Sequence, residues 1–151
     1  MRLIQVPSLS LLAARQVLIV DDEPDIREMM VMWLRDDERC ASVLQAGDLD
    51  SAVEIIEQQS PDAVLLDFFL GSRISVEELP RMRLACPTAV IVVYTASPED
   101  AQAAGVLEAG ANLLLEKGQT DIDEVVELLL STPLASTAGD RVRRDADEQA
   151  G

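Results

Sequence analysis

At residues 17–30 the chain reads VLIVDDEPDIREMM, and this stretch decides the fold. Its four leading apolar residues are typical of a parallel strand that is buried on both faces. Pro24 suits the first turn of a helix, where its missing N–H costs nothing. The residues that follow show apolar side chains at helical spacing. We therefore expect an amphipathic helix that packs Met29, Met30 and Trp33 into the core.

The same alternation of an apolar run and a helical pattern recurs along the chain. Apolar runs predict further strands at 63–66, 89–94 and 113–115, and a more polar run predicts an edge strand at 40–46. Helical patterns follow at 48–56, 76–85, 98–110 and 121–130, the first with Asp48 as its cap and the second made short or irregular by Pro80. This order predicts an α/β fold: a doubly wound, flavodoxin-like, five-stranded parallel sheet of order 2-1-3-4-5.

The length of 151 residues predicts one domain, which we place at 16–131. Residues 1–15 are expected to be an extension, and the Ala-, Ser- and Thr-rich residues 132–151 a disordered tail without an output domain. No apolar run is long enough for a membrane helix and no clear signal-peptide cleavage site is present, so a cytoplasmic protein is expected. The two cysteines, Cys40 and Cys86, are then expected to be reduced.

The net charge and the absence of histidine argue against several classes of function. The net charge is −16, which argues against direct binding of nucleic acid and favours a protein partner or a small ligand held with a cation. Histidine is absent, which excludes a Ser-His-Asp hydrolase, a histidine-ligated zinc site and a phosphohistidine carrier.

Polar side chains gather where the predicted strands end. Asp21 and Asp22 follow the first strand, and Asp67 follows the third. Thr95 ends the fourth strand and Lys117 follows the fifth. Because ligands of open parallel sheets bind beyond the carboxyl ends of the strands, we expect these side chains to converge there.

This set of side chains suits phosphoryl transfer. Three close carboxylates need a positive charge among them, and Mg²⁺ binds carboxylate, water and phosphate oxygens. Lys117, the single lysine of the chain, offers a compact charge for a phosphoryl oxygen, and Thr95 offers a hydroxyl group. Each residue alone is better explained as a turn, cap or solvent-exposed residue. Their joint placement on four strand ends favours function.

The sequence resembles the receiver domain of two-component response regulators. The matching segments are VLIVDDEPDIREMM, AVLLDFFLG, VIVVYTAS and GANLLLEKG, within about 17–130. The resemblance implies that Asp67 is the phosphoacceptor, with Thr95 as the switch hydroxyl and Lys117 as the cation that pairs with the phosphoryl group. It also implies a Mg²⁺ site formed by Asp22, Asp67 and the main-chain carbonyl of Phe69, with Asp21 holding the ion largely through water.

Three positions depart from the pattern of this family. Gly118 stands where proline normally follows the lysine, and Leu114 stands where an aromatic residue commonly moves with the switch threonine. Phe69 is bulky and lies two residues after Asp67, so it is expected to hinder the hydrolytic water and slow dephosphorylation.

These observations lead to a principal hypothesis and two alternatives. The principal hypothesis is a non-enzymatic, stand-alone receiver that takes its phosphoryl group from a histidine kinase or phosphotransfer protein and signals to a downstream protein target, with a homodimer left open. The first alternative is a receiver-like binding module that does not switch by phosphorylation. The second, a Mg²⁺-dependent phosphohydrolase, ranks last because no acid-base carboxylate lies two residues past Asp67.

Overall fold

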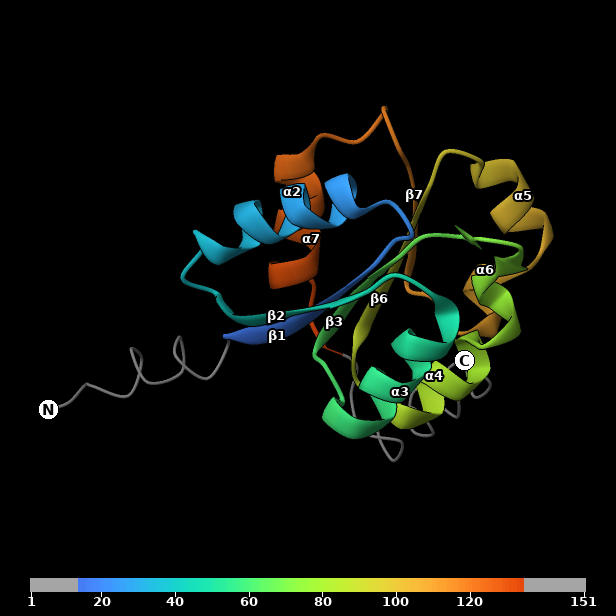
Figure 1. Cartoon of the computed structure of the whole chain (residues 1–151), viewed down its shortest axis with the longest axis horizontal. Helices are drawn as coiled ribbons and strands as arrows, with labels where there is room; N and C mark the ends of the chain where they lie inside the picture. Colours follow the sequence, from blue (N-terminus) through green and yellow to red (C-terminus); the bar gives the residue numbers. More distant parts are fainter. Residues whose placement is uncertain (1–13, 135–151) are drawn as a thin grey trace, which may run out of the picture.

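The computed structural model describes residues 14–134, and their centre is a five-stranded parallel sheet (Figure 1). The strands are β1 (Arg15–Val20), β2 (Cys40–Ala46), β3 (Ala63–Leu66), β6 (Val90–Thr95) and β7 (Leu113–Glu116). Their order is β2-β1-β3-β6-β7, and every neighbouring pair is parallel. The α/β fold and the 2-1-3-4-5 order are therefore confirmed, as is the edge position of 40–46.

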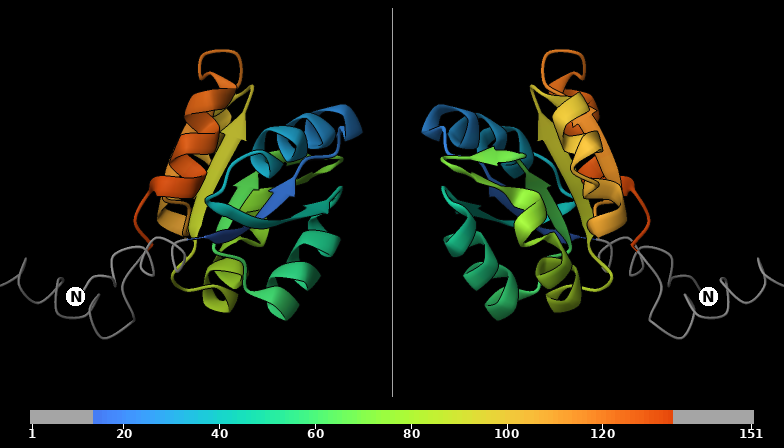
Figure 2. Two further views of the ribbon diagram at one scale, coloured as in Figure 1. Left: turned by 90° about the vertical axis from the view of Figure 1, so that its left-hand side faces the viewer. Right: turned by 90° about the vertical axis from the view of Figure 1, so that its right-hand side faces the viewer.

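Helices cover both faces of this sheet (Figures 1 and 2). One face packs against α2 (Pro24–Arg35) and α7 (Ile122–Ser131). The other packs against α3 (Leu49–Gln59), the short 3₁₀ helix η1 (Ser75–Glu77), α4 (Leu79–Ala85), α5 (Pro98–Ala103) and α6 (Val106–Ala109). Two apolar layers thus enclose the central strands, and β3 and β6 have no exposed residue.

Several local features follow from single residues. The Asp48 carboxylate accepts a hydrogen bond from the Ser51 N–H and caps α3, as expected. The strand at 17–20 begins two residues earlier than expected because Arg15 and Gln16 also pair with β2. Cys40 and Cys86 are both free thiols, as expected.

The single helix expected at 98–110 is wrong, because this segment forms α5 and α6. Gly105 separates the two helices with a φ of 81°, a left-handed conformation that glycine adopts at little cost. The apolar spacing continues across this break, since both helices pack on the same sheet face. Periodicity alone therefore did not show it.

The expectation that Trp33 packs in the core is also wrong. The buried residues of α2 are Met30, Val31 and Leu34, while 46% of the Trp33 surface and 68% of the Met32 surface are exposed. The buried face of α2 is therefore formed by Met30, Val31 and Leu34, and Trp33 lies outside this face. No helix in the described part of the chain is both long and apolar enough to span a bilayer.

A two-stranded hairpin after β3 was not expected. Its strands β4 (Phe69–Leu70) and β5 (Arg73–Ile74) are antiparallel and are joined by Gly71 and Ser72. Gly71 has a φ of 63°, the conformation that a tight hairpin turn needs at its first central position. This hairpin turns the chain back beside the end of β1, which matters for the site described next.

Candidate functional site

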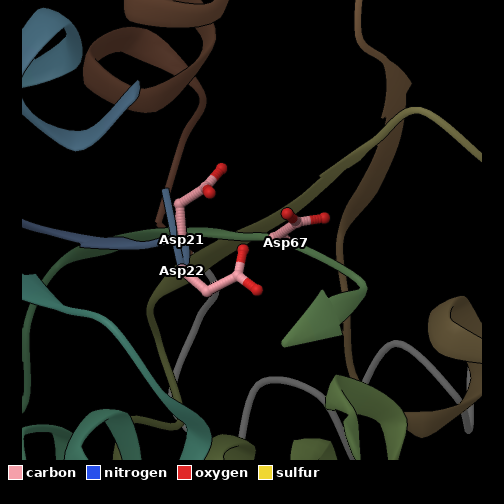
Figure 3. A group of neighbouring side chains, drawn as sticks. All are labelled: Asp21, Asp22 and Asp67. Atoms are coloured by element: carbon pink, nitrogen blue, oxygen red, sulfur yellow. The ribbon is translucent and has the colours of Figure 1, made fainter. Parts of the chain in front are cut away.

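Three aspartates meet at the carboxyl ends of β1 and β3. Each of Asp21, Asp22 and Asp67 offers a carboxylate oxygen that lies within 4.8 Å of the others (Figure 3). The pairing of β1 with β3 explains this, since Val20 lies opposite Leu66 and the Asp67 N–H donates to the Val20 carbonyl at 3.0 Å. The convergence expected from the strand ends is therefore present.

Main-chain groups hold two of these aspartates in place. One Asp21 oxygen accepts from the Glu23 N–H at 2.9 Å, which fixes the turn into α2. The Asp22 carboxylate accepts from the Gly71 N–H at 3.1 Å, across the loop from the hairpin. Main-chain N–H groups thus orient Asp21 and Asp22. The Asp67 carboxylate instead contacts a side chain, that of Lys117.

Lys117 is the partner that Asp67 and Asp21 share. Its ammonium lies 2.8 Å from an Asp21 oxygen and 3.1 Å from an Asp67 oxygen. The side chains of Asp21, Asp67 and Lys117 are 5%, 12% and 21% exposed, so solvent screens this interaction only in part. With Asp22, the group holds three carboxylates and one ammonium, which leaves two negative charges when all are ionised.

Burial raises the pKa of Asp67 to about 6, the charge of Lys117 lowers it, and the negative charge of Asp21 raises it further. Burial also acts to lower the pKa of Lys117, but its bonds and attraction to Asp21 and Asp67 outweigh burial and raise this pKa. The ammonium therefore stays charged, while the carboxylate that faces it carries an unfavourable charge above about pH 6.

Two further predicted site residues are Thr95 and Phe69. Thr95 is 1% exposed at the end of β6, where its hydroxyl oxygen accepts from the Ser97 N–H at 3.1 Å and its carbonyl accepts from the Lys117 N–H at 2.9 Å. Phe69 begins β4, and 44% of its surface is exposed. The roles that the resemblance implies for these residues stay predictions.

Two of the positions that depart from the family pattern, Leu114 and Gly118, lie in or next to β7. Leu114 is partly buried and packs on the apolar layer beside α4, α5 and α6. Gly118 has a φ of 87°, which proline cannot adopt, and no cis peptide bond is present among residues 14–134. The loop after β7 is therefore set differently from one that has proline at this position.

Three contributors were missed by the sequence-based reasoning. The N–H of Gly71 orients Asp22. Arg27 donates to the Asp21 carbonyl at 2.6 Å. Tyr94 places its ring 5.8 Å from the Lys117 ammonium. Only Gly71 had a usable signal, because Gly-Ser is a residue pair typical of a two-residue hairpin turn.

The donor set fits a hard divalent cation. Its ligands would be carboxylate oxygens, which Mg²⁺ prefers, and the two excess negative charges match the charge of one such ion. The raised pKa of Asp67, caused first by burial, shows that the carboxylate gains from additional positive charge. Asp22 and Asp67 would hold the ion, with Asp21 engaged by Lys117.

The sequence model of the response regulator receiver domain matches residues 17–129. The chain belongs to this family. This chain is 31% identical over 127 residues to the nitrate/nitrite response regulator protein NarP of Escherichia coli, and the alignment covers 84% of this chain and 57% of NarP. It is 33% identical over 106 residues to the phosphate regulon transcriptional regulatory protein PhoB of Klebsiella pneumoniae, which covers 69% and 45% of the two chains.

Another relative is an enzyme as a whole. The protein-glutamate methylesterase/protein-glutamine glutaminase of Rhizobium etli is 34% identical over 100 residues, which are 66% of this chain and 29% of that protein. The aligned part of this chain thus spans between 29% and 57% of the length of these relatives. The shared part belongs to two-component regulatory systems and indicates a signalling role.

Solved structures agree on the fold. A two-component response regulator of the LuxR family from Aurantimonas sp. matches with a TM-score of 0.69 and 26% identity, over 91% of this chain and 99% of that chain. A CheY-like receiver domain protein from Methanospirillum hungatei matches with a TM-score of 0.67 and 20% identity, over 91% and 98%. The second of these supports the receiver fold alone.

Proposed function

We propose that this receiver domain accepts a phosphoryl group on Asp67, with Mg²⁺ bound beside it, from a histidine kinase or phosphotransfer protein. The observation that best supports this proposal is the contact of the Lys117 ammonium with both Asp21 and Asp67. The three carboxylates and one ammonium of this group have a net charge of −2 when all are ionised. Phosphoryl transfer depends mainly on positioning and on neutralising charge, and these residues supply both.

The step itself can be written for the residues present. An Asp67 carboxylate oxygen attacks phosphorus, an O–P bond forms, and the P–N bond of a phosphohistidine donor, or the P–O bond of acetyl phosphate, breaks with its electron pair going to the donor. The Lys117 ammonium moves from the Asp67 oxygen to a phosphoryl oxygen, and the Thr95 hydroxyl donates to another. When bound, Mg²⁺ supplies positive charge to the carboxylate and the phosphoryl oxygens.

Loss of the phosphoryl group is proposed to be slow. Phe69 stands two residues after Asp67, and its exposed ring packs edge-on against Phe68 with 4.7 Å between the ring centres. An apolar ring held in this way offers no hydrogen bond to orient a water molecule for attack on the acyl phosphate.

Signalling is proposed to proceed through contacts with a downstream protein in the cytoplasm, without direct binding of nucleic acid. The net charge of −16 favours protein partners with basic surfaces. A stand-alone role and a homodimer are further parts of this proposal, and a mass measurement in solution tests the homodimer.

A second candidate function is a receiver that binds partners without switching. Leu114 favours it, because this residue is already packed on the apolar layer and offers no aromatic ring to move with Thr95. Under this candidate, partner binding is the same with and without the phosphate mimic beryllofluoride.

Intact mass after incubation with acetyl phosphate and Mg²⁺ tests the principal proposal. We expect one added phosphoryl group in the wild type and none in the Asp67→Ala variant. Glu38→Ala, which removes an exposed carboxylate outside the site, should label like the wild type. An unlabelled wild type, or equal labelling of Asp67→Ala, contradicts the proposal.

A further inference from the structure

Tyr94 lies under the ammonium of Lys117. It is the last residue but one of β6, it is 8% exposed, and it belongs to the apolar layer beside α2 and α7. The Lys117 Nζ lies over its ring at 5.8 Å from the ring centre, within the range in which an aromatic face attracts a cation. We propose that Tyr94 is a positioning residue, whose ring holds the Lys117 ammonium at the phosphoryl site. This inference rests on the proposed function.

The backbone after Lys117 gives the side chain little help. Gly118 adopts a φ of 87°, and nothing lies within 4 Å of the place where its Cβ would be. The Lys117 main chain is fixed by its N–H bond to the Thr95 carbonyl and by a bridge to Thr120. These bonds leave the four-carbon stem free to rotate, so the contacts of the ammonium decide where it lies.

Those contacts do not persist equally through the proposed reaction. The Asp67 oxygen that Lys117 contacts belongs to the group that is phosphorylated, and Asp21 lies in the group that a divalent cation enters. The Tyr94 ring has no part in either event. The ammonium can therefore keep its contact with the ring while it moves from the Asp67 oxygen to a phosphoryl oxygen.

The first test compares the rates at which acetyl phosphate labels Asp67. Tyr94→Phe keeps the ring and should label at the wild-type rate. Tyr94→Leu keeps an apolar side chain without the ring and should label roughly two- to five-fold more slowly. Val92→Ala is the matched control, because Val92 is fully buried on the same face of β6 and pairs with Leu113, four residues before Lys117. Its rate should stay at that of the wild type.

Equal rates for the wild type and folded Tyr94→Leu would overturn the positioning role. The same holds if Val92→Ala is slowed as much as Tyr94→Leu, because the effect would then come from lost packing. Loss of the wild-type rate in Tyr94→Phe also counts against it, since the ring and not the hydroxyl is proposed to hold the ammonium.

The second test does not depend on phosphorylation. Lys117 is the only lysine of the chain, so ¹³C-lysine labelling gives a single lysine ε-CH₂ signal. Protons above an aromatic face are shifted upfield by its ring current. We expect an upfield signal in the wild type and in Tyr94→Phe, and a random-coil position in Tyr94→Leu.

An unshifted signal in the folded wild type overturns the inference whatever the labelling result. An unlabelled wild type that shows the upfield shift refutes the proposed function and leaves Tyr94 as the residue that holds Lys117. The two failures are thereby distinguished.

Discussion

At the scale of single residues, Asp67 combines burial with two charged neighbours of opposite sign. Burial raises its pKa to about 6, with Lys117 acting against this and Asp21 adding to it. The free carboxyl of an unfolded chain has a pKa of about 4. Between these values the folded protein therefore binds more protons than the unfolded chain, and Asp67 makes the metal-free protein less stable as pH rises.

Replacing Asp67 by asparagine should remove this dependence. In EDTA, Asp67→Asn is expected to gain stability over the wild type progressively from about pH 4 to about pH 6, because the variant has no charge to bury. The gain should then level off on the order of 2 kcal/mol. Urea unfolding across this range measures it. Glu38→Gln serves as the exposed control, and a gain for Asp67→Asn that is constant with pH would contradict the assignment.

Phe69 supports a kinetic prediction at the same scale. Phe69→Asn replaces an exposed apolar ring with a side chain that can hydrogen-bond water, so the acyl phosphate should hydrolyse severalfold faster. The decay of the phosphorylated mass after removal of acetyl phosphate measures this. Leu107→Asn changes a similarly exposed apolar residue on α6 and should leave the decay unchanged. An unchanged half-life in Phe69→Asn refutes the role given to this ring.

The strand-end rule explains how much of the site could be predicted. Asp21, Asp67 and Lys117 each follow a parallel strand, so the topology brings them to one edge whatever their side chains do. The Gly71 bond to Asp22 depends on a hairpin that reverses the chain, and the Tyr94 contact depends on the course of a flexible lysine stem. Neither is fixed by spacing along the sequence.

At the scale of secondary-structure elements, Arg83 on α4 makes hydrogen bonds to the segment after α6 and to the segment before β6. Its guanidinium donates to the Gly110 carbonyl after α6 at 2.7 and 3.0 Å, and to the Ala89 carbonyl before β6 at 2.7 Å. It also binds the Asn112 side chain, whose oxygen accepts from the Ile91 N–H. One side chain on α4 thus satisfies the carbonyls at which α6 ends and β6 begins.

Removal of this guanidinium should destabilise the fold. Arg83→Met keeps much of the stem but leaves partly buried carbonyls without donors, at a cost on the order of 2 kcal/mol. Arg81→Met is the matched control on the same helix, because Arg81 makes ion pairs with Glu57 and Glu78 at the surface. The loss of stability in Arg81→Met should therefore be much smaller than in Arg83→Met. Urea midpoints measure both, and equal losses would contradict the role of Arg83.

The elements that the sequence predicted correctly are those with a strong physical signature. Runs such as 63–66 are buried on both faces and contain no polar residue to confuse the assignment. The break at Gly105 and the outward side of Trp33 had no such signature. In both cases the apolar spacing continued, and the packing of the neighbouring helices decided the result.

At the scale of the whole molecule, the acidic group at the sheet edge belongs to a chain with a net charge of −16. Such a charge disfavours any further negative group, and a phosphoryl group adds one. A divalent cation at Asp22 and Asp67 offsets this charge locally, whereas monovalent salt only screens it. Metal binding should therefore be visible in global stability.

We expect Mg²⁺ to stabilise the protein at constant ionic strength. An ion that binds the folded chain alone adds about 2.7 kcal/mol when it is present at a hundredfold excess over Kd. Thermal unfolding with MgCl₂, against NaCl of equal ionic strength, measures the effect. Asp22→Ala should abolish it and Glu38→Ala should retain it. A shift that survives in Asp22→Ala places the ion elsewhere.

Trp33, the residue expected in the core and found at the surface, has a practical consequence. It is the only tryptophan of the chain, and it lines a surface hollow together with Tyr94, Gly118 and Thr120. The protein therefore carries one intrinsic fluorophore beside the loop that follows Lys117. Its emission wavelength and its quenching by iodide therefore offer a measure of changes in that loop in the unlabelled protein.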